Sequence, residues 1–88
     1  MTDNNPKTMP KQIRPLRELV EEVVDNYLKT LDGHKPCDLH GMVISETEHA
    51  LIATVMKHSE NNQSRAAECL NLNRGTLRKK LRQYQLLK

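Results

Sequence analysis

The sequence predicts an all-α protein with two long helices followed by a C-terminal helix-turn-helix. Its 88 residues include two Tyr, no Trp and no Phe, so the core must be aliphatic, which favours helices packed on helices over a β-sandwich. Apolar residues recur at helical spacing over residues 16–31 and again over residues 39–56. The stretch from Asn62 to Tyr84 then holds two short amphipathic segments joined by an Asn-rich turn.

The first long helix is predicted from Pro15 to about Leu31. Proline suits the first turn of a helix, where its missing N–H costs nothing. Apolar residues follow at i, i+3, i+4 and i+7 along the whole segment, with acidic residues outside this stripe. Gly33 and Pro36 end the helix, because glycine accepts the left-handed backbone and proline cannot continue it.

The second long helix is predicted to begin after Asp38, a good N-cap, and to run to about Ser59. Its second half is apolar nearly all round and must therefore be covered on more than one side. A chain of this length buries only about 60% of its unfolded surface, so we expect the long helices to share a core with a second copy. The expected dimer core contains Leu19, Val20, Val23, Val24, Tyr27, Leu28, Leu51 and Val55.

The C-terminal segment has the pattern of a DNA-binding helix-turn-helix. A short helix rich in small residues is predicted over Gln63–Leu70, followed by a turn over Asn71–Asn73 in which asparagine supplies both left-handed backbone and a cap. A second helix starts at Arg74 and carries Leu77, Leu81 and Tyr84 on one stripe, with basic residues on the other side.

Charge is distributed unevenly along the chain. Residues 60–88 carry seven Lys or Arg against two acids, a net of +5, and the other residues carry seven against nine, a net of −2, which together give the overall +3. A basic end on a mildly acidic body predicts a polyanionic partner at that end. The alternative is an ordinary solvated helix face, but clustering on a capped amphipathic helix favours the functional interpretation.

Three segments are predicted within one compact domain: a flexible N-terminal arm over residues 1–14, dimerisation helices over residues 15–60, and the helix-turn-helix over residues 61–88. Neither a signal peptide nor a membrane span is recognisable. Cys37 and Cys69 are too few for a disulfide framework, so we expect reduced thiols and a cytoplasmic protein.

The sequence shows no catalytic constellation, no glycine-rich phosphate loop and no cofactor motif, which predicts a protein without enzymatic activity. His34, Cys37 and His40 raise the possibility of a metal, but the run crosses the Gly33–Pro36 break and lacks a fourth donor, so no metal is expected. His40, His49 and His58 are nine residues apart and therefore alternate between opposite helix faces.

The run NNQSRAAECLNLNRGTLRKKLRQY resembles the C-terminal helix-turn-helix of the Fis family of bacterial nucleoid-associated DNA-bending proteins, and NRGTLRKKL is its most characteristic piece. The resemblance extends over about Pro15 to Tyr84. The same motif closes the larger NtrC-type activators, but a short chain starting at Met1 favours a stand-alone Fis-like protein. The resemblance implies a homodimer in which two long helices of each subunit form an intertwined bundle.

The resemblance also implies DNA contacts at Asn62, Ser64, Asn73, Arg74, Thr76, Arg78, Lys79 and Lys80. Asn73 and Arg74 lie where a recognition helix reaches base edges, and arginine can pair bidentately with guanine. Phosphate contacts position the protein without reading sequence, and they suit Asn62, Ser64, Thr76, Lys79 and Lys80. Capping alone is the other interpretation for the two asparagines.

Several positions depart from the family pattern. Asn61 and Asn71 stand where glycine is common, and asparagine can adopt the same backbone. Glu60 replaces a basic residue, which should weaken a phosphate contact, and Ala50 replaces a helix-kinking proline, which allows a straighter helix. The short arm lacks the strand pattern of the family hairpin that touches DNA invertases, so stimulation of recombination is not predicted.

We therefore expect a homodimeric nucleoid-associated protein of the bacterial cytoplasm that binds and bends duplex DNA and regulates transcription. Its specificity should be weak, with a preference for A/T-rich site centres. The alternatives are a protein-interaction module, or a regulator that recognises few operators and does not bend them; an RNA role is disfavoured by the scarcity of aromatic residues. No contact with a membrane is expected, and no recombinase or RNA polymerase contact is assigned.

Overall fold

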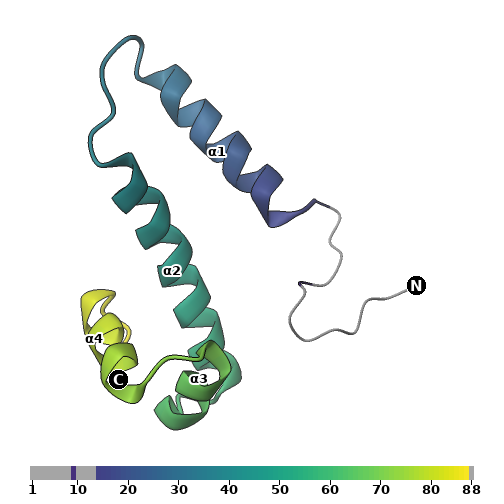
Figure 1. Cartoon of the computed structure of the whole chain (residues 1–88), viewed down its shortest axis with the longest axis vertical. Helices are drawn as coiled ribbons and strands as arrows, with labels where there is room; N and C mark the ends of the chain where they lie inside the picture. Colours follow the sequence, from purple (N-terminus) through teal and green to yellow (C-terminus); the bar gives the residue numbers. More distant parts are fainter. Residues whose placement is uncertain (1–8, 10–13, 88) are drawn as a thin grey trace. The chain divides into compact units, whose positions relative to one another are not determined.

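The computed structural model describes Met9 and residues 14–87, and these residues form helices joined by turns and loops, without any strand (Figure 1). The helices are α1 (Leu16–Thr30), α2 (Leu39–His58), α3 (Gln63–Leu70) and α4 (Arg74–Gln83). The all-α prediction is confirmed. The predicted arm, residues 1–14, lies outside the described residues except for Met9 and Arg14.

The chain divides into two compact units, Met1–Cys37 and Asp38–Lys88. Helix α2 therefore belongs to the same unit as the helix-turn-helix, in which α3 and α4 pack against it. The assignment of residues 15–60 to dimerisation stays a prediction.

Helix α1 begins directly after Pro15, whose carbonyl oxygen accepts hydrogen bonds from the backbone N–H groups of Glu18 and Leu19 at 3.0 and 3.3 Å. The predicted stop is confirmed: the helix ends at Thr30, and Gly33 follows in the turn with a φ of 86° that glycine adopts without strain. None of its residues is buried. Apolar side chains of the stripe remain exposed at Leu16, Leu19, Val23 and Leu28.

Helix α2 begins with the predicted cap. An Asp38 carboxylate oxygen accepts a hydrogen bond from the backbone N–H of Gly41 at 3.3 Å, although Asp38 itself adopts the left-handed conformation, with a φ of 51°. A Cβ atom at Gly41 would run into this carboxylate, so the glycine makes room for the cap. The helix continues without interruption through Ala50, where the family pattern has proline.

The turn between α2 and α3 depends on two left-handed residues in succession, Glu60 at a φ of 54° and Asn61 at 62°. The backbone N–H of Asn61 donates to the carbonyl of Met56 at 2.9 Å, which satisfies the end of α2. Asparagine replaces glycine here as expected. The left-handed Glu60 was not anticipated, because glutamate rarely adopts this conformation.

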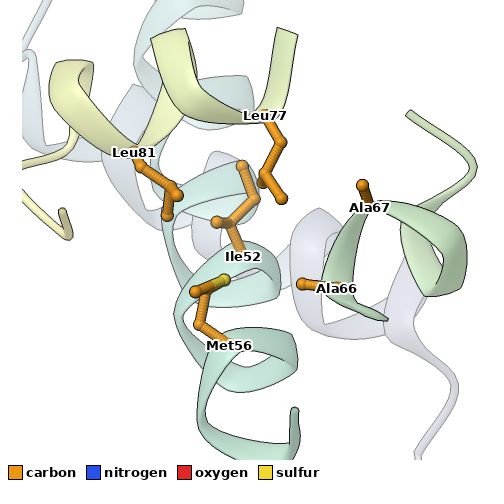
Figure 2. Close-up of a cluster of buried hydrophobic side chains, with 6 residues drawn as sticks. All are labelled: Ile52, Met56, Ala66, Ala67, Leu77 and Leu81. Carbon is orange, nitrogen blue, oxygen red and sulfur yellow. The ribbon is translucent and has the colours of Figure 1, made fainter. Parts of the chain in front are cut away.

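The core of the C-terminal unit is an aliphatic cluster supplied by three helices (Figure 2). Its members are Ile52 and Met56 of α2, Ala66 and Ala67 of α3, and Leu77 and Leu81 of α4. Burying a leucine or isoleucine side chain contributes about 1.5–3 kcal/mol. The two alanines allow the short helix α3 to approach closely. The predicted inward stripe of α4 is confirmed, with Tyr84 partly buried beside the cluster.

Candidate nucleic-acid interface

Helix α3 is delimited by two asparagines. The side-chain oxygen of Asn62 accepts a hydrogen bond from the backbone N–H of Arg65 at 3.1 Å and caps the N-terminus. Asn71 ends the helix in the left-handed conformation with a φ of 57°, and the N–H of Leu72 donates to the carbonyl of Ala67 at 3.0 Å. Asparagine thus takes the place of the glycine that commonly ends such helices.

Helix α4 is capped by Asn73, whose side-chain oxygen accepts from the backbone N–H of Thr76 at 2.7 Å. Arg74 is the first residue of this helix and is exposed. The N-terminus of a helix carries partial positive charge, which adds to that of the guanidinium group and favours an anion. The turn chemistry predicted for residues 71–73 is confirmed.

The outward side of α4 is basic. Arg74, Arg78, Lys79 and Arg82 are exposed, whereas the leucines on the other side of the helix are buried. Gly75 is also exposed, and an added Cβ atom there would meet only the side-chain oxygen of Asn73 at an ordinary 3.5 Å. Since nothing inside the protein requires glycine at this position, the missing side chain instead suits close approach by an external surface.

A shallow groove lies at the turn between α3 and α4. It is lined by Ser64, Ala67, Glu68, Asn71, Leu72, Asn73 and Arg74. The turn therefore brings Ser64 of α3 beside the start of α4, as expected for residues that contact one surface. Glu68 lines the same groove and places a carboxylate among these candidate contacts, which no pattern in the sequence had indicated.

The other candidate residues have more varied surroundings. Arg78 donates from Nη1 to the side-chain oxygen of Gln63 at 3.3 Å, so this hydrogen bond crosses from α4 to α3. Thr76 is half-buried, and Lys79 is exposed. Asn62 and Ser64 are exposed at the start of α3. All of these residues remain candidates, and their contacts with DNA stay predictions.

Lys80 differs from the other candidates because it has an ionic partner within the chain. Its Nζ lies 2.9 Å from Oε2 of Glu48, and both side chains are only about one-quarter exposed, at 27% and 26%. The hydroxyl of Tyr84 donates to the other carboxylate oxygen, Oε1, at 2.7 Å. Lys80 of α4 and Tyr84, which directly follows this helix, therefore bind one carboxylate of α2.

These contacts change the acidity of both oxygen groups. The hydrogen bond from Tyr84, assisted by Lys80, holds the pKa of Glu48 below its ordinary value of 4.5. The same hydrogen bond raises the pKa of Tyr84 above 10.0, because it stabilises the protonated phenol. His49 also stacks its ring on that of Tyr84 with centroids 5.4 Å apart. His49 is exposed, and its sequence spacing did not indicate this contact with Tyr84.

The structure offers no metal site in the part of the chain that it describes. Among Met9 and residues 14–87, no group of three or more His, Cys, Asp or Glu side chains is placed to hold a metal ion. Cys37 and Cys69 are free and exposed. Within the same residues, no helix has the length and apolar character needed to cross a membrane.

Comparison with known proteins gives two matches to family models. Residues 43–84 match the family described as bacterial regulatory protein, Fis family, and residues 1–36 match the DNA-binding protein Fis N-terminal domain. A protein of Glaesserella parasuis named DNA-binding protein Fis is 55% identical over 71 residues, which cover 81% of this chain and 72% of that protein. The chain belongs to the Fis family.

Other Fis proteins extend the similarity. DNA-binding protein Fis of Aeromonas hydrophila is 45% identical over 83 residues, covering 94% of this chain and 84% of its own. The same-named protein of Mannheimia haemolytica is 48% identical over 71 residues, covering 81% and 72%. The resemblance carried by NRGTLRKKL is confirmed. The Fis family match over residues 43–84 begins inside α2, in keeping with the packing of α2 against α3 and α4.

Proposed function

We propose that this Fis-family chain is a non-enzymatic, homodimeric protein that binds and bends duplex DNA and regulates transcription in the bacterial nucleoid. The observation that carries this proposal is the exposed basic face of α4, which begins at Arg74. The opposite side of the helix packs into the buried aliphatic cluster. A recognition helix needs such a face to enter the major groove, and it needs the packing on its other side to hold its orientation. The relatives named as DNA-binding proteins support the same function.

Base reading is assigned to the N-terminal end of α4. Asn73 and Arg74 stand where a recognition helix meets base edges, and Arg74 can form a bidentate pair with guanine. Asn62, Ser64, Thr76 and Lys79 are assigned to phosphates. Arg78 lies one turn beyond Arg74 and extends the basic face, while its bond to Gln63 braces it against α3.

The test separates recognition of DNA bases from contacts with phosphates. Arg74→Ala should lower the affinity for a preferred site by about 1–3 kcal/mol while changing the affinity for random duplex much less. Lys79→Gln should weaken binding to both duplexes alike and make the salt dependence shallower by about 0.9 unit for each phosphate that is no longer neutralised. Equal weakening at every sequence in Arg74→Ala would contradict base reading. A wild-type protein that bound an acidic protein and ignored duplex DNA would show a protein-interaction module instead.

Dimerisation is proposed through α1 and α2. Leu19, Val23, Leu28 and Leu51 are more than 40% exposed in the chain, at 41%, 63%, 43% and 52%. We expect these exposed apolar side chains of both long helices to be buried in a core shared by two subunits. The proposed core also includes Val20, Val24, Tyr27 and Val55. Val55 additionally packs against the cluster beneath the helix-turn-helix, so it links the proposed dimer core to the DNA-binding unit. Sedimentation equilibrium at micromolar concentration should give the dimer mass; a folded monomer would contradict this part.

Bending is the architectural part of the proposal. The resemblance to the Fis family implies that the two recognition helices of the dimer lie closer together than successive major grooves of straight B-DNA. Both can then enter only where the duplex deforms, at a cost of about 1–6 kcal/mol that depends on its sequence. Changing only the base pairs between two fixed half-sites from A/T to G/C should therefore lower the affinity without moving the outer contacts. Indifference to the centre, together with no bend in circularly permuted fragments, would favour a regulator of few operators that does not bend DNA.

A further inference from the structure

We propose that Glu48 competes with DNA phosphates for Lys80 and so limits the non-specific affinity of the recognition helix. This inference rests on the proposed DNA-binding function. It concerns a residue of α2 that lies outside the basic face. The starting point is the 2.9 Å ion pair between Lys80 Nζ and Glu48 Oε2, with both side chains about three-quarters buried.

The position of Lys80 on α4 makes this competition direct. Thr76, a proposed phosphate contact, lies four residues before Lys80, and Tyr84 lies four residues after it. Residues at this spacing share a helix face. Lys80 therefore lies between the proposed DNA surface at one end of the face and the contact with α2 at the other. A phosphate that approaches Lys80 therefore competes with a carboxylate that already neutralises the ammonium group.

The contacts around the Glu48 carboxylate stabilise its ion pair with Lys80. Tyr84 donates to Glu48 Oε1 at 2.7 Å, and the ring of Tyr84 is covered by the stacked ring of His49. The hydrogen bond from Tyr84 and the ion pair with Lys80 both favour the ionised form of Glu48. Exchanging one anionic partner for another yields little net energy and releases few counterions, since Lys80 is already neutralised. Lys79, the exposed neighbour of Lys80 in sequence, is assigned to a phosphate and does not take part in the ion pair with Glu48.

The adjacent lysines provide a matched comparison. Binding to a short mixed-sequence duplex is measured by fluorescence anisotropy between about 50 and about 200 mM KCl, where each lysine–phosphate contact contributes about 0.9 to the slope of log K against log salt. Lys79→Gln should make the slope shallower by this amount for each subunit, whereas Lys80→Gln should leave it nearly unchanged. An equal effect of the two substitutions would overturn the proposal, because Lys80 would already be bound to phosphate.

Glu48→Gln tests the competition from the other side. The amide oxygen can still accept from Tyr84, but Lys80 loses its ionic partner and becomes available to DNA. The slope should steepen by about 0.9 for each lysine released, so the affinity gained at 50 mM salt exceeds that at 200 mM by about threefold for each lysine. The double substitution Glu48→Gln with Lys80→Gln should return the slope to the wild-type value.

Glu46→Gln is the control for removing one negative charge from α2, since Glu46 is an exposed acid on the same helix. It should change the slope much less than Glu48→Gln. A gain of equal size in Glu46→Gln, or a gain that survives in the double variant, would show a general charge effect and overturn the proposal. An unchanged slope in a folded Glu48→Gln protein would also overturn it. Wild-type protein without salt-dependent duplex binding would instead refute the proposed function beneath it.

Discussion

Asn73 offers a way to separate the two roles of a residue that both caps a helix and faces the proposed DNA surface. Its side-chain oxygen accepts from the Thr76 N–H at 2.7 Å, and it lines the groove beside Arg74. Serine and aspartate cap helices about as well as asparagine, whereas alanine does not cap. Asn73→Ser and Asn73→Asp should therefore keep the free energy of unfolding close to wild type, and Asn73→Ala should lower it by about 1 kcal/mol, within a range of about 0.5–2.

DNA binding should rank the same variants differently. A carboxylate at position 73 would face the phosphates with a like charge, which costs about 1 kcal/mol at 4 Å in a water-like medium, or about a fivefold loss of affinity for each subunit. Asn73→Ser removes the amide without adding charge and should reduce discrimination between sites more than it reduces random binding.

Urea denaturation followed by circular dichroism gives the stability, and anisotropy on specific and random duplexes gives the affinity. If Asn73→Asp bound DNA as tightly as wild type, Asn73 would be a cap and nothing more. If Asn73→Ser lost as much stability as Asn73→Ala, the capping bond would not be what stabilises the start of α4. Either result would refute the dual role.

Two further predictions concern stability. Leu81 is fully buried in the cluster of Figure 2, so Leu81→Ala should lower the free energy of unfolding by about 2–5 kcal/mol, seen as a large fall in the thermal midpoint; a decrease below about 1 kcal/mol would contradict this packing. The pKa of Glu48 is lowered by folding, so its stabilising contribution is present above the ordinary pKa of 4.5 and is lost as pH falls through the lower folded value. Glu48→Gln should therefore flatten the acid side of the stability profile, and an unchanged profile would contradict the assigned network.

Local signals in the sequence were sufficient for most of the fold. Caps at Asp38, Asn62 and Asn73 act within three residues of themselves, and apolar periodicity acts within a few turns, so both can be read without tertiary information. The left-handed conformations of Asn61 and Asn71 followed from the same local chemistry. The predicted helices and their bounds agree with the structure to within about one residue or two.

Long-range pairing could not be read in the same way. Glu48 and Tyr84 are 36 residues apart, and whether they meet depends on how α4 crosses α2, which no periodicity encodes. Lys80 therefore looked equivalent to Lys79 in the sequence, although only Lys80 reaches this carboxylate. The stacking of His49 on Tyr84 was missed for the same reason. The left-handed Glu60 was missed because it contradicts the usual preference of its residue type.

Hydroxyl-radical footprinting of the wild-type protein on duplex DNA tests the central claim most directly. A dimer presenting two copies of α4 should protect two patches on one face of the duplex, separated by about one helical turn of 10–10.5 base pairs. Both patches should fade together as salt rises, because phosphate contacts dominate the affinity. A single protected patch would contradict the dimeric arrangement, and no protection at any salt concentration would contradict DNA binding by the basic face of α4.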